Sequence, residues 1–267
     1  MDPLCKNCDG PILEGQRFCG SCGQRSQIHR FGVHDLTHEL IHYFTHADKG
    51  LFTLLRELAL RGGAVAREFL DGRRRRHFSP LNFFLIVAAV LVFIMSFQPV
   101  PNAANVLAEN PRIAAITDPE IRQAALAMME RRANAIAVLN RYANLLAMAA
   151  LPLTALAMWL FFRKRGYSFT EHLVAGMYML GFCLLLYALV VVPLCALAGF
   201  PDDAAKGILF LLQLTYFSIF YIQMFRLRGW GRGRAVLASA VSLLLWIVLS
   251  GGAVMLYIRS GFFGLAG

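Results

Sequence analysis

The chain has 267 residues, of which 58% are hydrophobic and 16% are charged, and its formal net charge is +10. A water-soluble domain of this size would not stay in solution easily with so apolar a composition, so these values exclude an ordinary soluble globular protein and indicate a membrane protein. The positive charge points to a membrane surface. We expect no nucleic-acid partner, because the basic stretches show no interleaved aromatic residues that could stack on bases.

The N-terminus carries two CxxC pairs, Cys5 with Cys8 and Cys19 with Cys22, each followed by glycine at Asp9-Gly10 and Gly23. Glycine allows the tight turn that brings both thiolates of a pair onto one ion. Four thiolates complete a tetrahedral site, so the pattern predicts one structural zinc in a ribbon over residues 1–27. The few apolar residues of the ribbon cannot build a core without metal. A redox or iron–sulfur role stays open as the alternative.

The start of the chain is polar and bears cysteines where a signal peptide needs an apolar run. We therefore expect residues 1–79 to remain in a reducing, cytoplasmic compartment, where thiols rarely form disulfides.

Histidine recurs at every fourth position in the next segment, at His34, His38, His42 and His46. This spacing places the four imidazoles on one stripe of an amphipathic helix, which we expect to lie at the level of the lipid headgroups. Gly50 is suited to a left-handed cap at the end of this helix. Two more amphipathic segments, 51–60 and 64–70, complete a juxtamembrane region over residues 28–79.

The same stretch spells HELIH, the HExxH pattern in which His38 and His42 bind zinc and Glu39 activates a water molecule. However, histidines spaced by four already supply two of the three defining residues of HExxH, and only the acid at position 39 is then needed to complete it by chance. The motif is therefore weak evidence for an enzyme. His46 cannot be the third ligand, because it lies about 12 Å along the helix axis from His38. Two other histidines expected on the same side are candidates for that ligand: His77 and His172.

Four consecutive arginines, Arg73, Arg74, Arg75 and Arg76, precede the first long apolar segment. Each can attract anionic lipid headgroups with about 1 kcal/mol. A role in fixing the membrane topology alone is the alternative, and the two roles are compatible.

Five apolar segments are each long enough to cross roughly 30 Å of hydrocarbon as a helix. They are residues 80–98, 142–162, 172–199, 206–225 and 235–258, so residues 80–267 form the predicted transmembrane region. Three basic clusters fall on one side of this arrangement, which predicts a cytoplasmic N-terminus, an external loop over 99–141 and an external C-terminus. The fold class is therefore an all-α membrane protein with a five-helix transmembrane bundle.

Smaller signals refine this scheme. Asp118-Pro119-Glu120 predicts a helix start with a capping aspartate and a proline in the first turn. Pro193 predicts a kink in the third span. Cys183 and Cys195 lie in the same span and are interpreted as small apolar residues.

Several of these motifs together resemble an uncharacterised bacterial family of zinc-ribbon multipass membrane proteins, a domain-of-unknown-function family. The resemblance rests on the paired cysteines, on FCGSCGQ from Phe18 to Gln24, on HADKG, on EFLDGRRRRHFSP and on FTEHLV from Phe169 to Val174. Members typically carry a Glu-His pair, here Glu171 and His172, and many continue with further histidines, which in this chain are replaced near Tyr178 and Leu180. The five-span arrangement is also similar to that of the Yip1-like membrane proteins, which act in trafficking or as scaffolds.

These observations favour a protein of the bacterial inner membrane that is a non-enzymatic scaffold, adaptor or regulator. The expected partners are anionic lipids and a cytoplasmic protein bound by the ribbon. A zinc hydrolase at the membrane surface is the alternative, and a transporter is disfavoured because the spans hold no buried acid or base for a proton relay.

Overall fold

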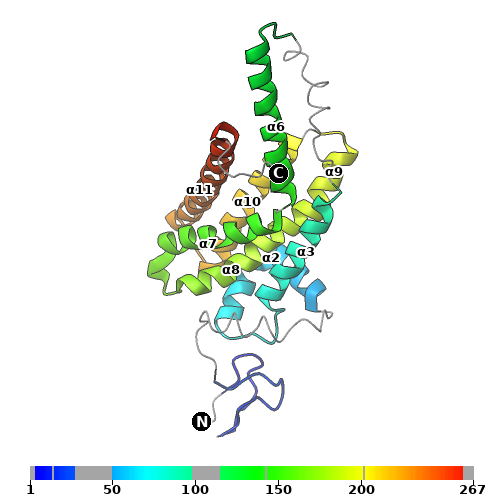
Figure 1. Ribbon diagram of the computed structural model, residues 1–267. Coiled ribbons are helices and arrows are strands. Elements are labelled where there is room, and N and C mark those ends of the chain that lie inside the picture. Colours follow the sequence, from blue (N-terminus) through cyan, green and yellow to red (C-terminus); the bar gives the residue numbers. More distant parts are fainter. Residues whose placement is uncertain are drawn as a thin grey trace.

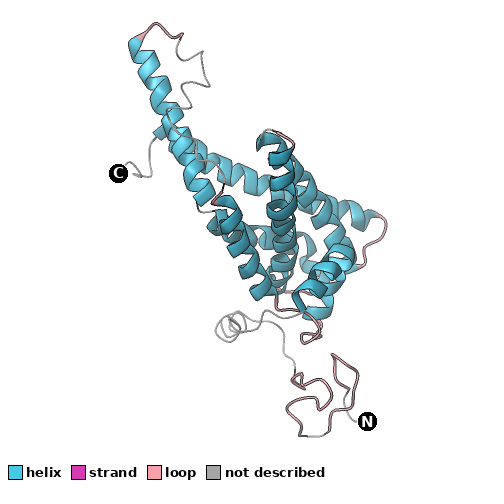
Figure 2. Ribbon diagram, turned by 90° about the vertical axis from the view of Figure 1, so that its right-hand side faces the viewer, coloured by secondary structure: helices cyan, strands magenta, loops and turns pink. Residues whose placement is uncertain are grey.

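The computed structural model describes residues 4–13, 15–27, 50–97, 115–141, 143–200 and 202–260. Beyond the N-terminal ribbon, these residues form a bundle of helices with no strand, and the ribbon contains only isolated bridges between Leu4 and Pro11 and between Phe18 and Arg25 (Figure 1, Figure 2). The described elements are α2 (Gly50–Leu70), α3 (Pro80–Met95), α6 (Pro119–Arg141), α7 (Ala143–Phe162), η1 (Arg163–Arg165), α8 (Phe169–Leu186), η2 (Tyr187–Val191), α9 (Val192–Leu197), α10 (Asp202–Phe225) and α11 (Trp230–Ser260).

Three helical stretches are long and apolar enough to cross a membrane: Phe169–Leu197, Ala204–Phe225 and Trp230–Leu256. They correspond to the last three predicted spans, and they mark the chain as an integral membrane protein. A shorter apolar helix occupies Pro80–Ile94, and α7 adds 20 residues. Large apolar side chains stay exposed on the outer faces of these helices, among them Leu211, Leu244 and Val248, as expected of surfaces that face lipid.

α2 packs inside the bundle, against α8 and α10, and does not lie apart from it. Its buried face includes Leu54, Leu58, Val65 and Phe69, which join one hydrophobic core with residues of α3, α7, α8, α10 and α11. The amphipathic pattern of segments 51–60 and 64–70 is thus explained by burial against protein. The two segments meet at Arg61, whose φ of −148° and ψ of 39° interrupt the helix.

Glycine is required where α2 meets α10. A Cβ atom added to Gly63 would lie 1.9 Å from the backbone oxygen of Phe220, and one added to Gly62 would lie 2.4 Å from the hydroxyl of Tyr216. At Gly63 the obstacle is backbone, so only glycine allows the two helices to approach this closely, whereas at Gly62 the side chain of Tyr216 would have to move.

Gly50 corrects one prediction from the sequence. It is the first residue of α2, and it is not among the glycines with positive φ, so it does not form the left-handed cap that we expected. The histidine segment that this cap should end lies outside the described residues.

One other local signal is confirmed, and the proline of the third span lies beside an irregular turn. The carboxylate of Asp118 accepts hydrogen bonds from the backbone of Glu120 at 2.9 Å and of Ile121 at 3.3 Å, so α6 starts with the expected capping aspartate. In the third span, Pro193 follows a π-helical turn, Tyr187–Val191, which separates α8 from α9. Proline lacks an N–H and crowds the carbonyl four residues earlier, and the wider turn accommodates both effects.

The ribbon and three basic loops lie at one end of the bundle. Tyr167 donates a 3.0 Å hydrogen bond to Asp71, and Arg67 donates to the carbonyls of Gln223 and Met224 at 3.1 Å, so the loops 71–79, 163–168 and 226–229 are neighbours. The ribbon lies beyond the first of these loops, whereas α6 projects from the other side of the bundle (Figure 1).

Candidate metal centre

The two cysteine pairs form turns with the same hydrogen bonds. In the first, the amide of Asp9 donates to the carbonyl of Cys5 at 2.8 Å, and the amide of Cys5 donates to the carbonyl of Gly10 at 2.8 Å. In the second, Gly23 donates to Cys19 at 2.8 Å, and Cys19 donates to Gln24 at 2.7 Å. Each turn folds the chain back so that both of its cysteines face the other pair.

We expected glycine to make both tight turns, but it does so only in the second. The residue after each pair has positive φ, and it is Gly23 (68°) in the second turn but Asp9 (57°) in the first. Aspartate tolerates this conformation better than most residues do. Gly10 serves close packing instead, because an added Cβ would lie 3.2 Å from Ser21 Oγ and 3.4 Å from Cys8 Sγ.

The four sulfur atoms of Cys5, Cys8, Cys19 and Cys22 all lie within 4.8 Å of one another and could hold a metal ion. Across the two turns, Cys5 Sγ lies 3.7 Å from Cys22 Sγ, and Cys8 Sγ lies 3.7 Å from Cys19 Sγ. A tetrahedron of thiolates with metal–sulfur bonds of about 2.3 Å has edges of about 3.8 Å. The donor set and its dimensions therefore fit a tetrahedral metal ion.

Backbone amides favour the thiolate form, which metal binding requires, at Cys19 and Cys22. At Cys8 the amide of Gly10 acts in the same direction, but hydrogen bonds with the neighbouring cysteines and burial outweigh it and raise the pKa to about 12. The amides of Cys22 and Ser21 point at the sulfur of Cys19 and lower its pKa to about 6, and the amide of Gln24 lowers the pKa of Cys22. A thiolate that accepts backbone hydrogen bonds is stabilised before any cation arrives.

The ribbon contacts the loop between α2 and α3 through the residues that follow Cys22. Gln24 is 5% exposed, and its Nε2 donates a 2.7 Å hydrogen bond to the carbonyl of Gly72 while its Oε1 accepts one from the amide of Arg75 at 3.2 Å. The guanidinium of Arg75 reaches the carbonyl of Gly23 at 3.4 Å. The side chain of Gln24 thus binds both Gly72 and Arg75 in the loop 71–79, which we call the arginine loop.

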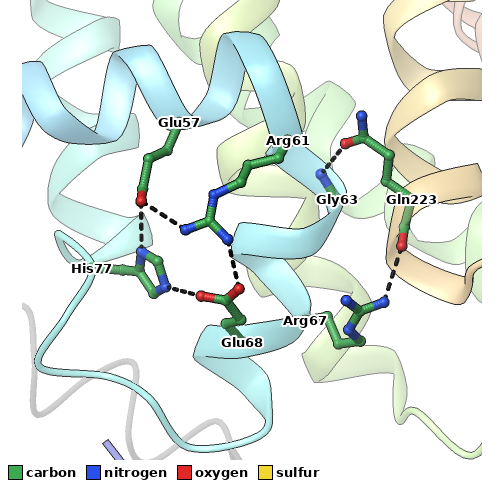
Figure 3. A network of polar contacts seen from close by, with 7 residues as sticks. All are labelled: Glu57, Arg61, Gly63, Arg67, Glu68, His77 and Gln223. Atoms are coloured by element: carbon green, nitrogen blue, oxygen red, sulfur yellow. Dashed lines mark hydrogen bonds and ion pairs between the residues drawn. The ribbon is translucent and has the colours of Figure 1, made fainter. Parts of the chain in front are cut away.

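A closed ring of four charged side chains lies on the bundle side of that loop (Figure 3). Arg61 bonds to Glu57 at 2.7 Å and to Glu68 at 2.6 Å. The two ring nitrogens of His77 lie 3.1 Å from Glu57 and 3.0 Å from Glu68. Nε2 makes a hydrogen bond with Glu68, whereas Nδ1 lies close to Glu57 without the geometry of a hydrogen bond. The ring joins both halves of the kinked α2 to the loop.

Gln223 of α10 satisfies the backbone groups that the kink frees (Figure 3). Its Oε1 accepts from the amide of Gly63 at 3.1 Å, and its Nε2 donates to the carbonyl of Leu60 at 3.4 Å. Arg67 binds the last carbonyls of α10. These contacts leave the interrupted turn of α2 with partners for its buried polar groups.

The other residues singled out from the sequence are distributed as follows. His34, Glu39 and the rest of the histidine stripe lie outside the described residues. His77 has a carboxylate at each ring nitrogen, and His172 is fully buried, with Nδ1 3.0 Å from the hydroxyl of Tyr221. Within the described part of the chain, the cysteine cluster is the one group of metal-ligating side chains. A second metal site at His38 and His42 remains a prediction.

The sequence analysis assigned no role to Glu57, Glu68, Gln223 or Gln24. The spacing of Glu57 and Arg61 was a visible signal, since residues four apart on a helix form ion pairs. The other partners come from a loop, a kink and a distant helix, and a single sequence holds no signal for them.

Comparisons with known proteins give one match. Residues 48–92 match a family described as "Protein of unknown function (DUF3667)". The matched segment contains α2, the arginine loop and most of α3, and with them all four residues of the charged ring. Together with the cysteine cluster, this match fits an uncharacterised family. No curated protein and no solved structure matches the chain.

Proposed function

We propose that the protein is a non-enzymatic adaptor or regulator of the bacterial inner membrane, in which a structural zinc ribbon presents a docking surface at the cytoplasmic face. The observation that carries the proposal is the closed set of four thiol groups, whose spacing suits a tetrahedral ion. An ion held by four protein ligands has no open position for substrate or water, so the expected role of the metal is to hold the ribbon together.

Zinc is the metal that this donor set favours in a reducing compartment. Tetrahedral thiolate sites hold zinc or iron–sulfur centres. The two tight turns with backbone hydrogen bonds to sulfur are typical of structural zinc sites, in which the metal supplies the folding energy that a small core lacks.

The membrane topology of the proposal is five spans with a cytoplasmic N-terminus and an external C-terminus. It is supported by the basic segments 73–76, 163–165 and 226–234, which belong to one end of the bundle, together with the ribbon. Basic residues are retained on the cytoplasmic side, where they also meet anionic headgroups. Arg73, Arg74, Arg75 and Arg76 are the proposed headgroup contacts.

The proposed protein partner would bind the outer face of the ribbon, where Leu4, Leu13 and Phe18 are 54–65% exposed. The test is crosslinking in cells followed by purification of wild-type protein and of a Cys19→Ser variant at matched membrane levels. We expect a defined cytoplasmic protein to be crosslinked by the wild type alone. An identical set of crosslinked proteins in both preparations would contradict the adaptor role.

A further inference from the structure

Gln24 connects the candidate metal centre to the arginine loop. Its carbonyl closes the second cysteine turn by accepting from Cys19 at 2.7 Å, and its side chain bonds to Gly72 and Arg75. Gln24 therefore belongs to the second cysteine turn and also contacts the arginine loop. The position of its side chain depends on whether the cysteine turn is formed.

The bundle side of this contact is formed without any metal. The amides of Asp71 and Arg73 bond to the last turn of α2, at 2.8 Å to Arg67 and 2.9 Å to Glu68. Tyr167 holds the side chain of Asp71, and His77 anchors the far end of the loop in the charged ring. All of these partners belong to the helices or to the loop itself, so the loop is a preformed platform.

The ribbon side depends on the ion. The buried apolar cluster of the ribbon consists of Cys5, Ile12 and Cys19, and Cys22 packs against it. All members except Ile12 are proposed ligands. A cluster this small cannot compensate for the conformational entropy of about twenty ordered residues, so without metal the second turn loses its shape.

We propose that the four-cysteine site is a metal-controlled latch on the arginine loop. With metal bound, the second cysteine turn holds Gln24 against Gly72 and Arg75, and the ribbon covers one side of the loop. Without metal, these hydrogen bonds are lost, and the arginine side chains of the loop become accessible to solvent and to anionic groups. The latch rests on the proposed function in one respect, namely that the cysteines bind a metal ion.

The four arginines make the latch measurable, because trypsin cleaves after each of them. Purified full-length protein in detergent is compared in two forms, one loaded with zinc and one stripped with a chelator that is then removed. The readout is the rate at which new N-termini appear at residues 74–77. We expect cleavage to be about tenfold faster in the stripped form, which is the protection that two hydrogen bonds of ordinary strength provide.

Two matched glutamine variants separate docking from metal binding. Gln24→Ala removes the contact with the loop, and we expect fast cleavage even with one zinc per chain. Gln16→Ala makes the same substitution elsewhere in the ribbon, where the side chain accepts from the amide of Leu13 at 3.2 Å, and we expect cleavage as slow as in the wild type. The site after Arg131 in α6, on the other side of the bundle, is the internal reference and should not respond to zinc.

The zinc content of each preparation shows whether a negative result contradicts the latch alone or also the proposed zinc site. Protein that binds zinc but is cleaved at residues 73–76 at one rate in both forms overturns the latch and leaves the structural zinc site intact. Protein that binds no zinc overturns the proposed function. If Gln24→Ala itself fails to bind zinc, two other variants test the contact: Arg75→Ala removes the guanidinium that reaches the carbonyl of Gly23, and Gln24→Glu removes the amide group that donates to Gly72. Unchanged protection of the remaining arginines in both variants counts against the latch.

Discussion

The ribbon and the helical bundle are stabilised by different means. The buried cluster of the ribbon is made of cysteines and one isoleucine, whereas the bundle buries large apolar side chains from six helices in one core. Polar residues differ in the same way. In the ribbon the four sulfur ligands would be balanced by a metal ion from solution, while in the bundle the side chain of Arg61 binds both Glu57 and Glu68. Of these two described regions, the ribbon is the one with a group of side chains that could respond directly to a metal ion.

Removing the metal should have the largest effect, and it should be confined to the ribbon. Structural zinc contributes about 10–16 kcal/mol to the folding of small zinc domains, so we expect the stripped ribbon to be unfolded. The bundle should keep its melting temperature, because its core contains no ribbon residue. Amide hydrogen exchange measured separately for residues 4–27 and for the helices checks both statements. Loss of protection in the core of α8 and α10 after stripping would show that the two regions are not independent.

Gly63→Ala should damage the bundle and leave the ribbon unchanged. The new methyl group would collide with the backbone of α10 at Phe220, so α2 must move away, at a cost of about 3 kcal/mol in the free energy of unfolding. Gly207→Ala in α10 is the matched control, because its Cβ meets nothing within 4 Å and a helical alanine is favoured over glycine by about 0.5–1 kcal/mol. Thermal unfolding in detergent, with the zinc content measured in parallel, provides the check. Equal melting temperatures for the two variants would contradict the close approach of α2 and α10.

Acid should weaken the charged ring by a smaller amount. Burial opposes ionisation of Glu68, but hydrogen bonds and charge from Arg61 and His77 outweigh it and lower the pKa of Glu68 below its ordinary value of 4.5. A lowered pKa in the folded state stabilises the protein above pH 4.5, and this contribution is lost as the pH falls below 4.5 through the folded-state pKa.

Glu68→Gln tests this assignment. We expect about 1–2 kcal/mol less stability at neutral pH and a flatter decline below pH 4.5, since hydrogen bonds to charged groups are worth more than neutral ones. Glu120→Gln, in the exposed first turn of α6, is the control and should leave the profile unchanged. If the Glu68→Gln profile still falls as steeply as that of the wild type, another group causes the acid sensitivity.

The features that could be predicted from the sequence are local ones. The spacing of the cysteines brings Cys5, Cys8, Cys19 and Cys22 together because each turn is made by adjacent residues. Asp118 caps α6 for the same reason, and the last three apolar segments are long enough to be recognised by length alone.

The remaining features depend on contacts between distant residues. Segments 51–60 and 64–70 have one apolar face, and that pattern is the same whether the face meets lipid or protein. Burial of Leu58 against α10 could therefore not be distinguished from a position at the membrane surface. His77 was named as a candidate metal ligand from its place beside the arginine run, and its two carboxylate neighbours, Glu57 and Glu68, could not be predicted because they come from either side of the kink at Arg61. The helical conformation of Gly50 was missed because a glycine inside a helix and one that caps a helix end look alike in a single sequence.

The most direct test of the account is the metal content per chain of purified, detergent-solubilised protein, determined by elemental analysis for zinc and iron. We predict one zinc and no iron in the wild type, and no zinc when Cys5 and Cys8 are both changed to serine. A wild-type protein without zinc, or a double variant that retains one zinc per chain, would contradict the central claim. Two zinc ions, one of which survives the serine changes and is lost in His38→Ala, would instead establish a second site at the histidine stripe and favour the hydrolase.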